Sequence, residues 1–244
     1  MKENKYDDDI FFEQYNQMSR SVKGLDGAGE WHILKNMLPD FENKAVLDLG
    51  CGLGWHCFYA VQQGAKSALG IDISEKMIAE AKRRNSSPLI KYRVSSIEDY
   101  EYPADMYDVV ISSLAFHYLE SFEDILVKIS KTLRKGGSFV FSVEHPIFTA
   151  YGNQDWFYDE QGNKMHWPVD RYFYEGERNA VFLGENVIKY HKTLTDYLGS
   201  LLKAGFEIVD IAESEPSQEM LESIPAMSDE LRRPMFLLVS SRKR

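Results

Sequence analysis

Apolar residues recur in two alternating patterns between residues 45 and 143. Short apolar runs that end in glycine or a polar residue predict buried parallel strands at 45–49, 67–72, 89–94, 107–113 and 138–143. Between these runs, apolar residues three and four positions apart predict amphipathic helices, the last of which is expected to end at Gly136 and Gly137. Because strand and helix alternate throughout, the pattern favours right-handed crossovers and a doubly wound parallel sheet.

The two flanks of this block carry weaker patterns. Two short helices are expected before it, the second stopped by Pro39, and regularity is lost over 144–186. A helix is expected to resume near Lys192, followed by strands at 206–211 and 235–240. The stretch between these strands has no clear helical pattern, so the last strand could return antiparallel. Four leucines are expected on the inward face of the helix, namely Leu194, Leu198, Leu201 and Leu202.

The length of 244 residues suits one α/β domain with a substantial insertion. We therefore expect a single domain over 1–244. Its parts are an N-terminal helical cap (1–44), a ligand-binding core (45–145), an insertion that covers the substrate (146–190) and a C-terminal part of the core (191–244).

The sharpest motif lies between the first strand and the first core helix, and reads Asp48-Leu49-Gly50-Cys51-Gly52-Leu53-Gly54. Gly50 can take the tight turn, and Gly52 lets a ligand approach the backbone closely. The helix that begins near Gly54 presents free N–H groups and a partial positive charge. The loop therefore predicts a site for an anionic group, either a phosphate or the carboxylate of an amino acid.

A second acidic residue, Asp72, ends the second strand 22 residues after Gly50. A carboxylate there can accept both hydroxyls of a ribose. A dinucleotide fingerprint reads G-x-G-x-x-G, but here the third glycine comes one residue early, at Gly54, and Trp55 takes the place that the fingerprint needs. Trp55 would also crowd a pyrophosphate, which disfavours the alternative of a nicotinamide oxidoreductase.

The pattern G-x-G-x-G preceded by an acid resembles motif I of the class I S-adenosylmethionine (SAM)-dependent methyltransferases. The likeness covers roughly 40–145 and 190–244. It implies a seven-stranded Rossmann-like sheet of order 3-2-1-4-5-7-6 with an antiparallel seventh strand, N-terminal helices and an insertion after strand 5. Outer motifs such as Glu30-Trp31 and Lys189-Tyr190-His191 look like a bacterial small-molecule branch, similar to methyltransferase type 11. The resemblance implies methyl transfer from SAM to a small-molecule acceptor, with S-adenosylhomocysteine as product.

The same resemblance implies roles for individual residues. The glycine loop would hold the methionine part of SAM, the acid after strand 2 the ribose, and the segments after strands 2 and 3 the adenine. Many members have Asp where Ser96 stands. In related enzymes a Tyr and an Arg from the N-terminal region also reach SAM. The residues assigned to SAM in this way are Tyr15, Arg20, Asp48, Gly50, Cys51, Gly52, Gly54, Asp72, Ile73, Met77, Ser96, Ile97, Glu98, Ser113, Leu114 and His117.

Methyl transfer is an in-line displacement, for which a protein mainly aligns the reacting atoms and excludes water. The chemistry requires no metal, and the sequence contains no Cys and His set that suggests one. If the acceptor must lose a proton, a general base is useful. His117, His145 and His191 are the candidates, of which His145 ends strand 5 on the ligand side, and His117 and His145 are preferred. Taken alone, each of them, and Glu144 as well, is more readily explained as a structural residue than as a catalytic one.

The insertion is rich in aromatic residues. They have two interpretations: a cover over the acceptor that binds apolar or cationic groups, or a small satellite core under a long loop. The sequence favours neither. The residues concerned are Trp156, Phe157, Tyr158, Trp167, Tyr172, Phe173 and Tyr174.

Composition narrows the function further. The net charge of −10 and the few short basic patches argue against a nucleic-acid partner. No signal peptide and no apolar run long enough for a bilayer is visible, and two cysteines are too few for a disulfide framework, so we expect a cytoplasmic protein without a membrane partner. The acidic run at 7–9 is expected to be a solvated tail. A non-catalytic SAM-binding protein and a protein or RNA methyltransferase remain as alternatives, and the oligomeric state does not follow.

Overall fold

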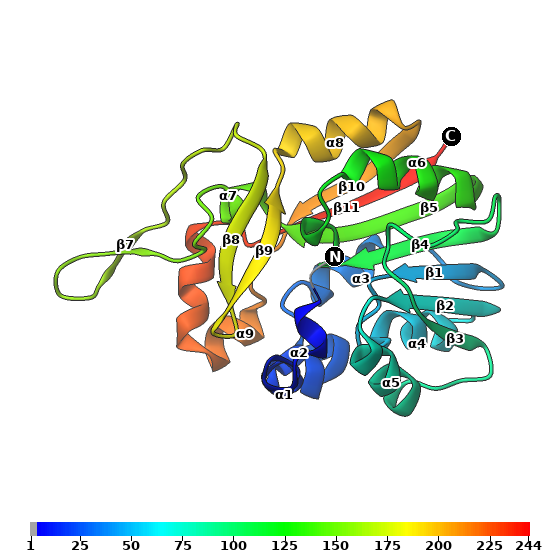
Figure 1. Ribbon diagram of the computed structural model, residues 1–244, viewed down its shortest axis with the longest axis horizontal. Helices are drawn as coiled ribbons and strands as arrows, with labels where there is room; N and C mark the ends of the chain where they lie inside the picture. Colours follow the sequence, from blue (N-terminus) through cyan, green and yellow to red (C-terminus); the bar gives the residue numbers. More distant parts are fainter. Residues whose placement is uncertain (1–3) are drawn as a thin grey trace.

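The computed structural model describes residues 4–244 and contains a central seven-stranded sheet (Figure 1). The strand order is β3-β2-β1-β4-β5-β11-β10, with β11 antiparallel to both of its neighbours. This confirms the predicted order and the antiparallel last strand. The strands are β1 (Ala45–Leu49), β2 (Ser67–Asp72), β3 (Ile90–Val94), β4 (Tyr107–Ser113), β5 (Leu133–Glu144), β10 (Phe206–Glu213) and β11 (Phe236–Lys243).

Helices cover both faces of the sheet because successive strand residues point to opposite sides. Leu47 and Phe141 pack with α6 and α8 on one face, whereas Val46 and Val140 pack with helices on the other. Two serines cap helices, since Ser74 and Ser121 accept hydrogen bonds from amides at the starts of α5 and α6. The helices of the core are α3 (Trp31–Met37), α4 (Trp55–Gln62), α5 (Glu75–Arg84), α6 (Phe122–Thr132) and α8 (Leu194–Lys203).

Two details of the core differ from the prediction. Helix α6 ends at Thr132 and β5 begins at Leu133, so Gly136 and Gly137 lie inside a long strand, where its pairing with β4 shifts register, and do not stop a helix. Leu202 was expected to face inward but its side chain is 55% exposed, because it lies at the end of α8 beyond the buried Leu201.

The insertion is more regular than predicted. Strands β8 (Gly176–Phe182) and β9 (Glu185–His191) form a hairpin beside the carboxyl ends of the central strands (Figure 1). Its two-residue turn has positive φ at Leu183 and Gly184, as a type I′ turn requires. The remaining elements of the insertion are α7 (Pro146–Thr149) and a short outlying hairpin of β6 (Phe157–Tyr158) and β7 (Lys164–His166).

Two segments outside the insertion complete the fold. The N-terminal part consists of η1 (Lys5–Asp7), α1 (Asp9–Gln17), α2 (Ser19–Val22) and η2 (Gly24–Gly27). The stretch before β11, predicted without helix, contains α9 (Gln218–Ser223) and η4 (Pro225–Arg232). Within 4–244, no helix combines the length and apolar character that crossing a bilayer requires.

Candidate functional site

A cavity of about 670 Å³ lies at the carboxyl ends of the parallel strands. Its inner walls come from residues that end or follow β1, β2, β4 and β5, namely Gly50, Asp72, Ser113 and Glu144. The N-terminal segment and the β8–β9 hairpin supply the rest, including Tyr6. This volume lies within the range of about 300–1,000 Å³ that is typical of small-molecule sites.

The glycine loop forms the tight turn that the sequence predicts. The amides of Gly50 and Cys51 both donate to the Ile71 carbonyl, which ties the loop to the neighbouring strand. A Cβ on Gly50 would lie 2.6 Å from the Cβ of Ala115, so only glycine fits there. A Cβ on Gly52 would meet no protein atom within 4 Å, because this residue borders the cavity.

Asp72 holds the loop from the side of the second strand. Its two carboxylate oxygens accept hydrogen bonds from the Gly52 amide and the Ser74 amide, each at 2.9 Å. Burial raises the pKa of Asp72, although these amides partly offset the effect. Each oxygen keeps a lone pair for a further donor, so Asp72, which lines the cavity, can also accept two hydroxyl groups.

Three of the residues assigned to SAM lie behind the cavity wall rather than in it. Asp48 is buried beneath the loop, with Oδ2 accepting from the Cys57 thiol at 3.5 Å, and burial raises its pKa to about 7. Cys51 is also buried. Gly54 lies against Tyr92, whose hydroxyl would be 2.4 Å from a Cβ at that position. All three shape the loop, and none is among the residues that line the cavity.

The other thirteen assigned residues line the cavity. Arg20 donates to the buried Glu30 at 2.8 Å, and the Ser113 hydroxyl donates to the same carboxylate at 3.4 Å. This network joins the N-terminal helices to the end of β4; Glu30 was noted only as part of an outer motif. The thirteen are Tyr15, Arg20, Gly50, Gly52, Asp72, Ile73, Met77, Ser96, Ile97, Glu98, Ser113, Leu114 and His117.

The structure places only one of the two preferred histidine candidates in the cavity wall. His117 lines the cavity, and its Nδ1 accepts from the Glu144 amide at 3.4 Å. Burial lowers the pKa of His117 to about 4, so it is neutral at pH 7. His145 lies outside the cavity lining, where its Nδ1 accepts from the Ile147 amide at the start of α7 and its Nε2 lies 2.9 Å from Glu213. The structure therefore favours the structural interpretation of His145.

Away from the glycine loop after β1, the cavity wall formed by β5 and the β8–β9 hairpin contains a polar cluster, in which the sequence assigned neither Lys189 nor Gln154. Lys189 donates to Glu144 at 2.6 Å and to Gln154 at 2.8 Å, and Gln154 in turn donates to Glu144 at 2.6 Å. Burial would raise the pKa of Glu144, but His117 and Lys189 outweigh it and lower that pKa. From the sequence, Glu144 was noted beside the histidine candidates, Lys189 was noted only as part of an outer motif, and Gln154 carried no signal.

None of the seven aromatic residues singled out in the insertion lines the cavity in the described part of the chain. Trp156 and Trp167 pack edge to face instead, and the Arg233 guanidinium lies 4.2 Å from the Trp167 ring centroid. Phe173 and Tyr174 are exposed. The satellite-core interpretation therefore describes the two tryptophans, and the aromatic cover of the cavity comes from Phe148 and Phe182.

Comparisons with known proteins agree with this geometry. A family model described as a methyltransferase domain matches residues 47–141. A solved structure from Listeria monocytogenes, named as an S-adenosylmethionine-dependent methyltransferase, is 58% identical, covers 91% of this chain and 99% of its own, and has a TM-score of 0.86. One from Mesorhizobium loti with the same kind of name is 41% identical over 90% of this chain and 100% of its own, with a TM-score of 0.83.

Sequence relatives extend the picture. A Haemophilus influenzae protein, named only "Uncharacterized protein", is 31% identical over 98% of this chain and 96% of its own length. A tRNA U34 carboxymethyltransferase from Actinobacillus succinogenes is 31% identical, but over only 46% of this chain and 36% of its own. The chain belongs to the class I SAM-dependent methyltransferases, and SAM is its methyl donor. Within residues 4–244 there is no group of three or more Cys, His, Asp and Glu side chains that could hold a metal ion.

Proposed function

We propose that the protein transfers the methyl group of SAM, in the cytoplasm, to a small molecule held at the end of the cavity away from the glycine loop. The observation that carries this proposal is that a single cavity of about 670 Å³ contains both the loop and the cluster around Glu144. The N-terminal segment and the β8–β9 hairpin cover it. A polymer such as RNA needs an open cleft, whereas a covered cavity suits an acceptor of few atoms.

We assign the cofactor end to the residues around the loop. The space beside Gly52 takes the methionine part of SAM, and Arg20 attracts its carboxylate. Asp72 accepts the ribose hydroxyls while it keeps its bonds to the Gly52 and Ser74 amides. Ile73 and Met77 pack on the adenine. The several acidic groups at this end also suit a donor that carries a positive charge.

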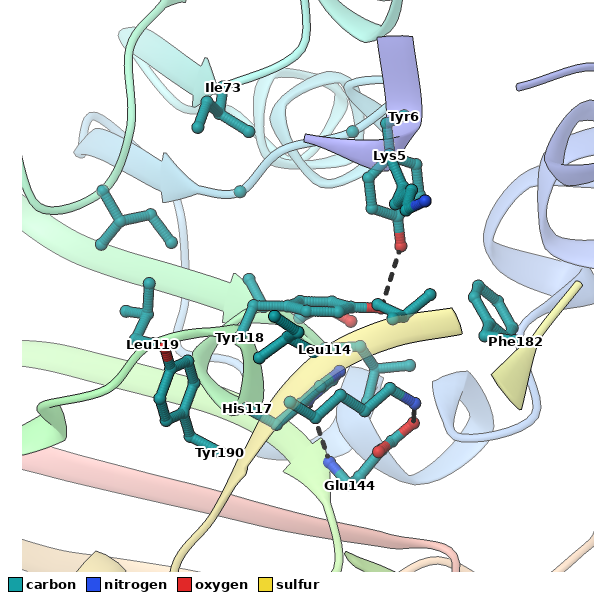
Figure 2. A pocket seen from close by; sticks show the side chains of 18 of the residues that line it. Lys5, Tyr6, Ile73, Leu114, His117, Tyr118, Leu119, Glu144, Phe182 and Tyr190 are labelled. Atoms are coloured by element: carbon teal, nitrogen blue, oxygen red, sulfur yellow. Dashed lines mark hydrogen bonds and ion pairs between the residues drawn. The ribbon is translucent and has the colours of Figure 1, made fainter. Parts of the chain in front are cut away.

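The chain itself aligns the reactants and excludes water. SAM supplies a methyl group on a sulfonium, whose positive charge is lost as the methyl leaves. Tyr6, Tyr15 and Tyr118 line the middle of the cavity, where aromatic faces attract a cation and displace solvent. Figure 2 shows Tyr118 between Tyr6 on one side and His117 with Glu144 on the other.

An RNA acceptor is the second candidate, because part of the chain matches the tRNA U34 carboxymethyltransferases. That match covers less than half of this chain and little more than a third of the relative's own length. The net charge of −10 also opposes a polyanion, since binding of nucleic acid relies on clustered Lys and Arg. We therefore favour the small molecule.

Labelled SAM tests the proposal directly. The purified protein is incubated with it and, in parallel, with a fractionated metabolite extract, total RNA and bulk protein. We expect label in a small-molecule fraction together with S-adenosylhomocysteine, and neither product with Gly50→Val, whose side chain would collide with Ala115. Label in RNA or protein alone contradicts the small-molecule acceptor. SAM binding without any S-adenosylhomocysteine would instead indicate a non-catalytic protein.

A further inference from the structure

The cluster at the far end of the cavity is assembled from three separate segments. Glu144 ends β5, Lys189 lies in β9, and Gln154 follows α7. Each side chain bonds to the other two at 2.6–2.8 Å. Figure 2 shows Glu144 beneath His117, and His117 beneath Tyr118. The chain therefore brings a carboxylate, an ammonium and an amide together at one wall of the substrate cavity.

Stability alone is a poor explanation for this cluster. The side chains of Lys189 and Glu144 are only 2% and 12% exposed, and the same end of the cavity is lined by Phe148, Phe182 and Phe236. Burying two charges costs solvation that their attraction barely returns, so apolar residues of similar size would stabilise the fold as well. A polar group placed at the wall of an apolar cavity is more readily explained by what it binds.

The hydrogen bonds within the cluster leave more acceptor positions than donor positions open to a ligand. The Lys189 ammonium donates to Glu144 and to Gln154 and lies 5.4 Å from the Phe182 ring centroid, so its directions are mostly taken. The two Glu144 oxygens accept one bond each, which leaves further lone pairs on both. One N–H of Lys189 and one of Gln154 remain, against a larger number of open lone pairs on the Glu144 and Gln154 oxygens, so the cluster can accept a hydrogen bond more readily than it can donate one.

We infer that Glu144 is a catalytic residue that binds the attacking group of the acceptor, and that the acceptor is a neutral, largely apolar or aromatic molecule with an N–H or O–H nucleophile. This inference rests on the proposed function. Lys189 and Gln154 are positioning residues, which hold the carboxylate in place and ionised. The neighbouring His117 accepts the Glu144 amide through Nδ1 and so keeps its own proton on Nε2.

The proposed step balances in atoms and charge. The acceptor nitrogen or oxygen forms a bond to the methyl carbon as the bond between that carbon and sulfur breaks, and the electron pair of that bond stays on sulfur. The proton of the N–H or O–H group passes to a Glu144 oxygen. The sulfonium charge and the carboxylate charge disappear together, and a neutral methylated product and S-adenosylhomocysteine remain. Solvent then takes the proton from Glu144, whose ionised form Lys189 favours.

Other classes of acceptor fit this wall less well. A carboxylate would face the negative charge of Glu144, and the ammonium that could balance it is already bonded to that residue. A protonated amine would lie near Lys189 and has no free electron pair to attack with. A neutral N–H or O–H group avoids both conflicts and uses the open lone pairs.

Matched pairs of simple molecules test the inference on the intact protein saturated with S-adenosylhomocysteine. The probes are phenol against anisole and benzimidazole against 1-methylbenzimidazole, which differ in the donor, together with benzoate. We expect calorimetry to show the donor member of each pair bound about tenfold tighter or more. Equal binding within the pairs, preferred binding of benzoate, or no binding by any member overturns the inference. None of these outcomes bears on the proposed function, which is tested separately by the incubation with labelled SAM.

The catalytic role is tested by steady-state kinetics. The substrate is a probe that the protein methylates, or the acceptor found in the screen. For Glu144→Gln we expect kcat to fall on the order of 100-fold, as for loss of a general base, with the acceptor KM nearly unchanged because the amide oxygen still accepts. Glu213→Gln, which alters another carboxylate beside a buried partner but outside the cavity, should keep wild-type kinetics. Glu144→Gln leaves the Lys189 ammonium without a negatively charged partner, so Glu144→Gln/Lys189→Met serves as a second variant. The SAM affinity of each variant shows whether it is folded. Wild-type kcat in either variant overturns the role.

Discussion

Two acids flank the glycine loop, the buried Asp48 and the half-buried Asp72, and their surroundings give them different properties. Asp72 accepts two backbone amides, whereas Asp48 accepts only the weak Cys57 thiol donor, and its Oδ1 has no hydrogen-bond partner among residues 4–244. A buried carboxylate with so little support is costly to ionise. Asp48 therefore shapes the loop at the expense of stability, and Asp72 is the acid that is free to meet a ligand.

Asp48→Asn should stabilise the protein without SAM, and more so at high pH. Its pKa in the folded protein is about 7, above the ordinary value of 3.8, so the folded state holds the proton more tightly. The free energy of unfolding therefore falls as pH rises from about 4 to about 7, by up to about 4 kcal/mol for this group. Asparagine does not ionise, so the free energy of unfolding of Asp48→Asn does not fall in this way. Urea unfolding should show a small gap between variant and wild type at pH 5 and a larger one at pH 8. This account is contradicted if the variant and the wild type differ in free energy of unfolding by the same amount at both pH values. It is also contradicted if Asp26→Asn, which changes an exposed carboxylate, stabilises the protein equally.

Asp72→Ala should weaken SAM binding by about 10- to 100-fold, because a hydrogen bond to a charged group contributes about 1.5–3 kcal/mol. The variant also frees the Gly52 amide, so the loop becomes less well ordered. Calorimetric titration with SAM measures the effect, with Asp26→Asn as the control for a lost surface charge. Unchanged affinity would remove Asp72 from the site.

At the scale of elements, the N-terminal segment acts as a strap over the cofactor end. The acidic run was expected to be a solvated tail, and that expectation is wrong. Asp7 accepts from the Ser74 hydroxyl at 2.5 Å and from the Lys76 amide at 3.1 Å, both at the start of α5. Next to it, the Tyr6 hydroxyl lies 3.2 Å from that of Tyr118 across the cavity. A carboxylate at a helix N-terminus is stabilised by the free amides there.

Asp7→Asn should loosen this strap and speed the release of SAM. Burial would raise the pKa of Asp7, but the hydrogen bonds from Ser74 and Lys76 outweigh it and lower that pKa, so the ionised cap is fully present at neutral pH. A lost cap costs about 1 kcal/mol, which corresponds to a roughly fivefold faster dissociation if the strap must open first. Stopped-flow fluorescence measures the rate. Asp9→Asn, which removes an exposed carboxylate paired with Lys76, is the control and should leave it unchanged.

The elements that the sequence predicted well are those whose signals are local. Gly50 and Asp72 lie at the ends of buried strands, and parallel topology alone brings those ends together. Lys189 and Gln154 carry no such signal, because a hairpin and a loop bring them to the cavity from a part of the chain without a clear period. The β8–β9 turn was also missed, since Leu183 is an unusual residue for a positive φ and the common Asn-Gly signal is absent.

At the scale of the whole molecule, an aromatic cluster joins the insertion to the C-terminal segment. The Arg233 guanidinium lies 4.2 Å from the Trp167 ring centroid and 4.6 Å from that of Phe148, and it donates to Glu230 at 2.7 and 3.2 Å. Phe148 is both a member of this cluster and part of the cavity lining. The tryptophans that were candidates for a lid therefore affect the acceptor end indirectly, through the position of Phe148.

Arg233→Met should loosen the insertion while leaving the cofactor end intact. The change removes a buried cation from three aromatic rings and leaves Glu230 without its partner, at a cost of about 2 kcal/mol. Because the cluster lies outside the sheet, we expect faster hydrogen exchange over 147–174, a higher acceptor KM and an unchanged SAM affinity. Arg93→Met is the control: its guanidinium lies 5.9 Å from the Tyr100 ring centroid, but the residue is exposed and belongs to the edge strand β3, away from the insertion, so its effect should be under about 0.5 kcal/mol. If both variants exchange alike, or if Arg233→Met weakens SAM binding as much as acceptor binding, the cluster does not couple the insertion to the acceptor end.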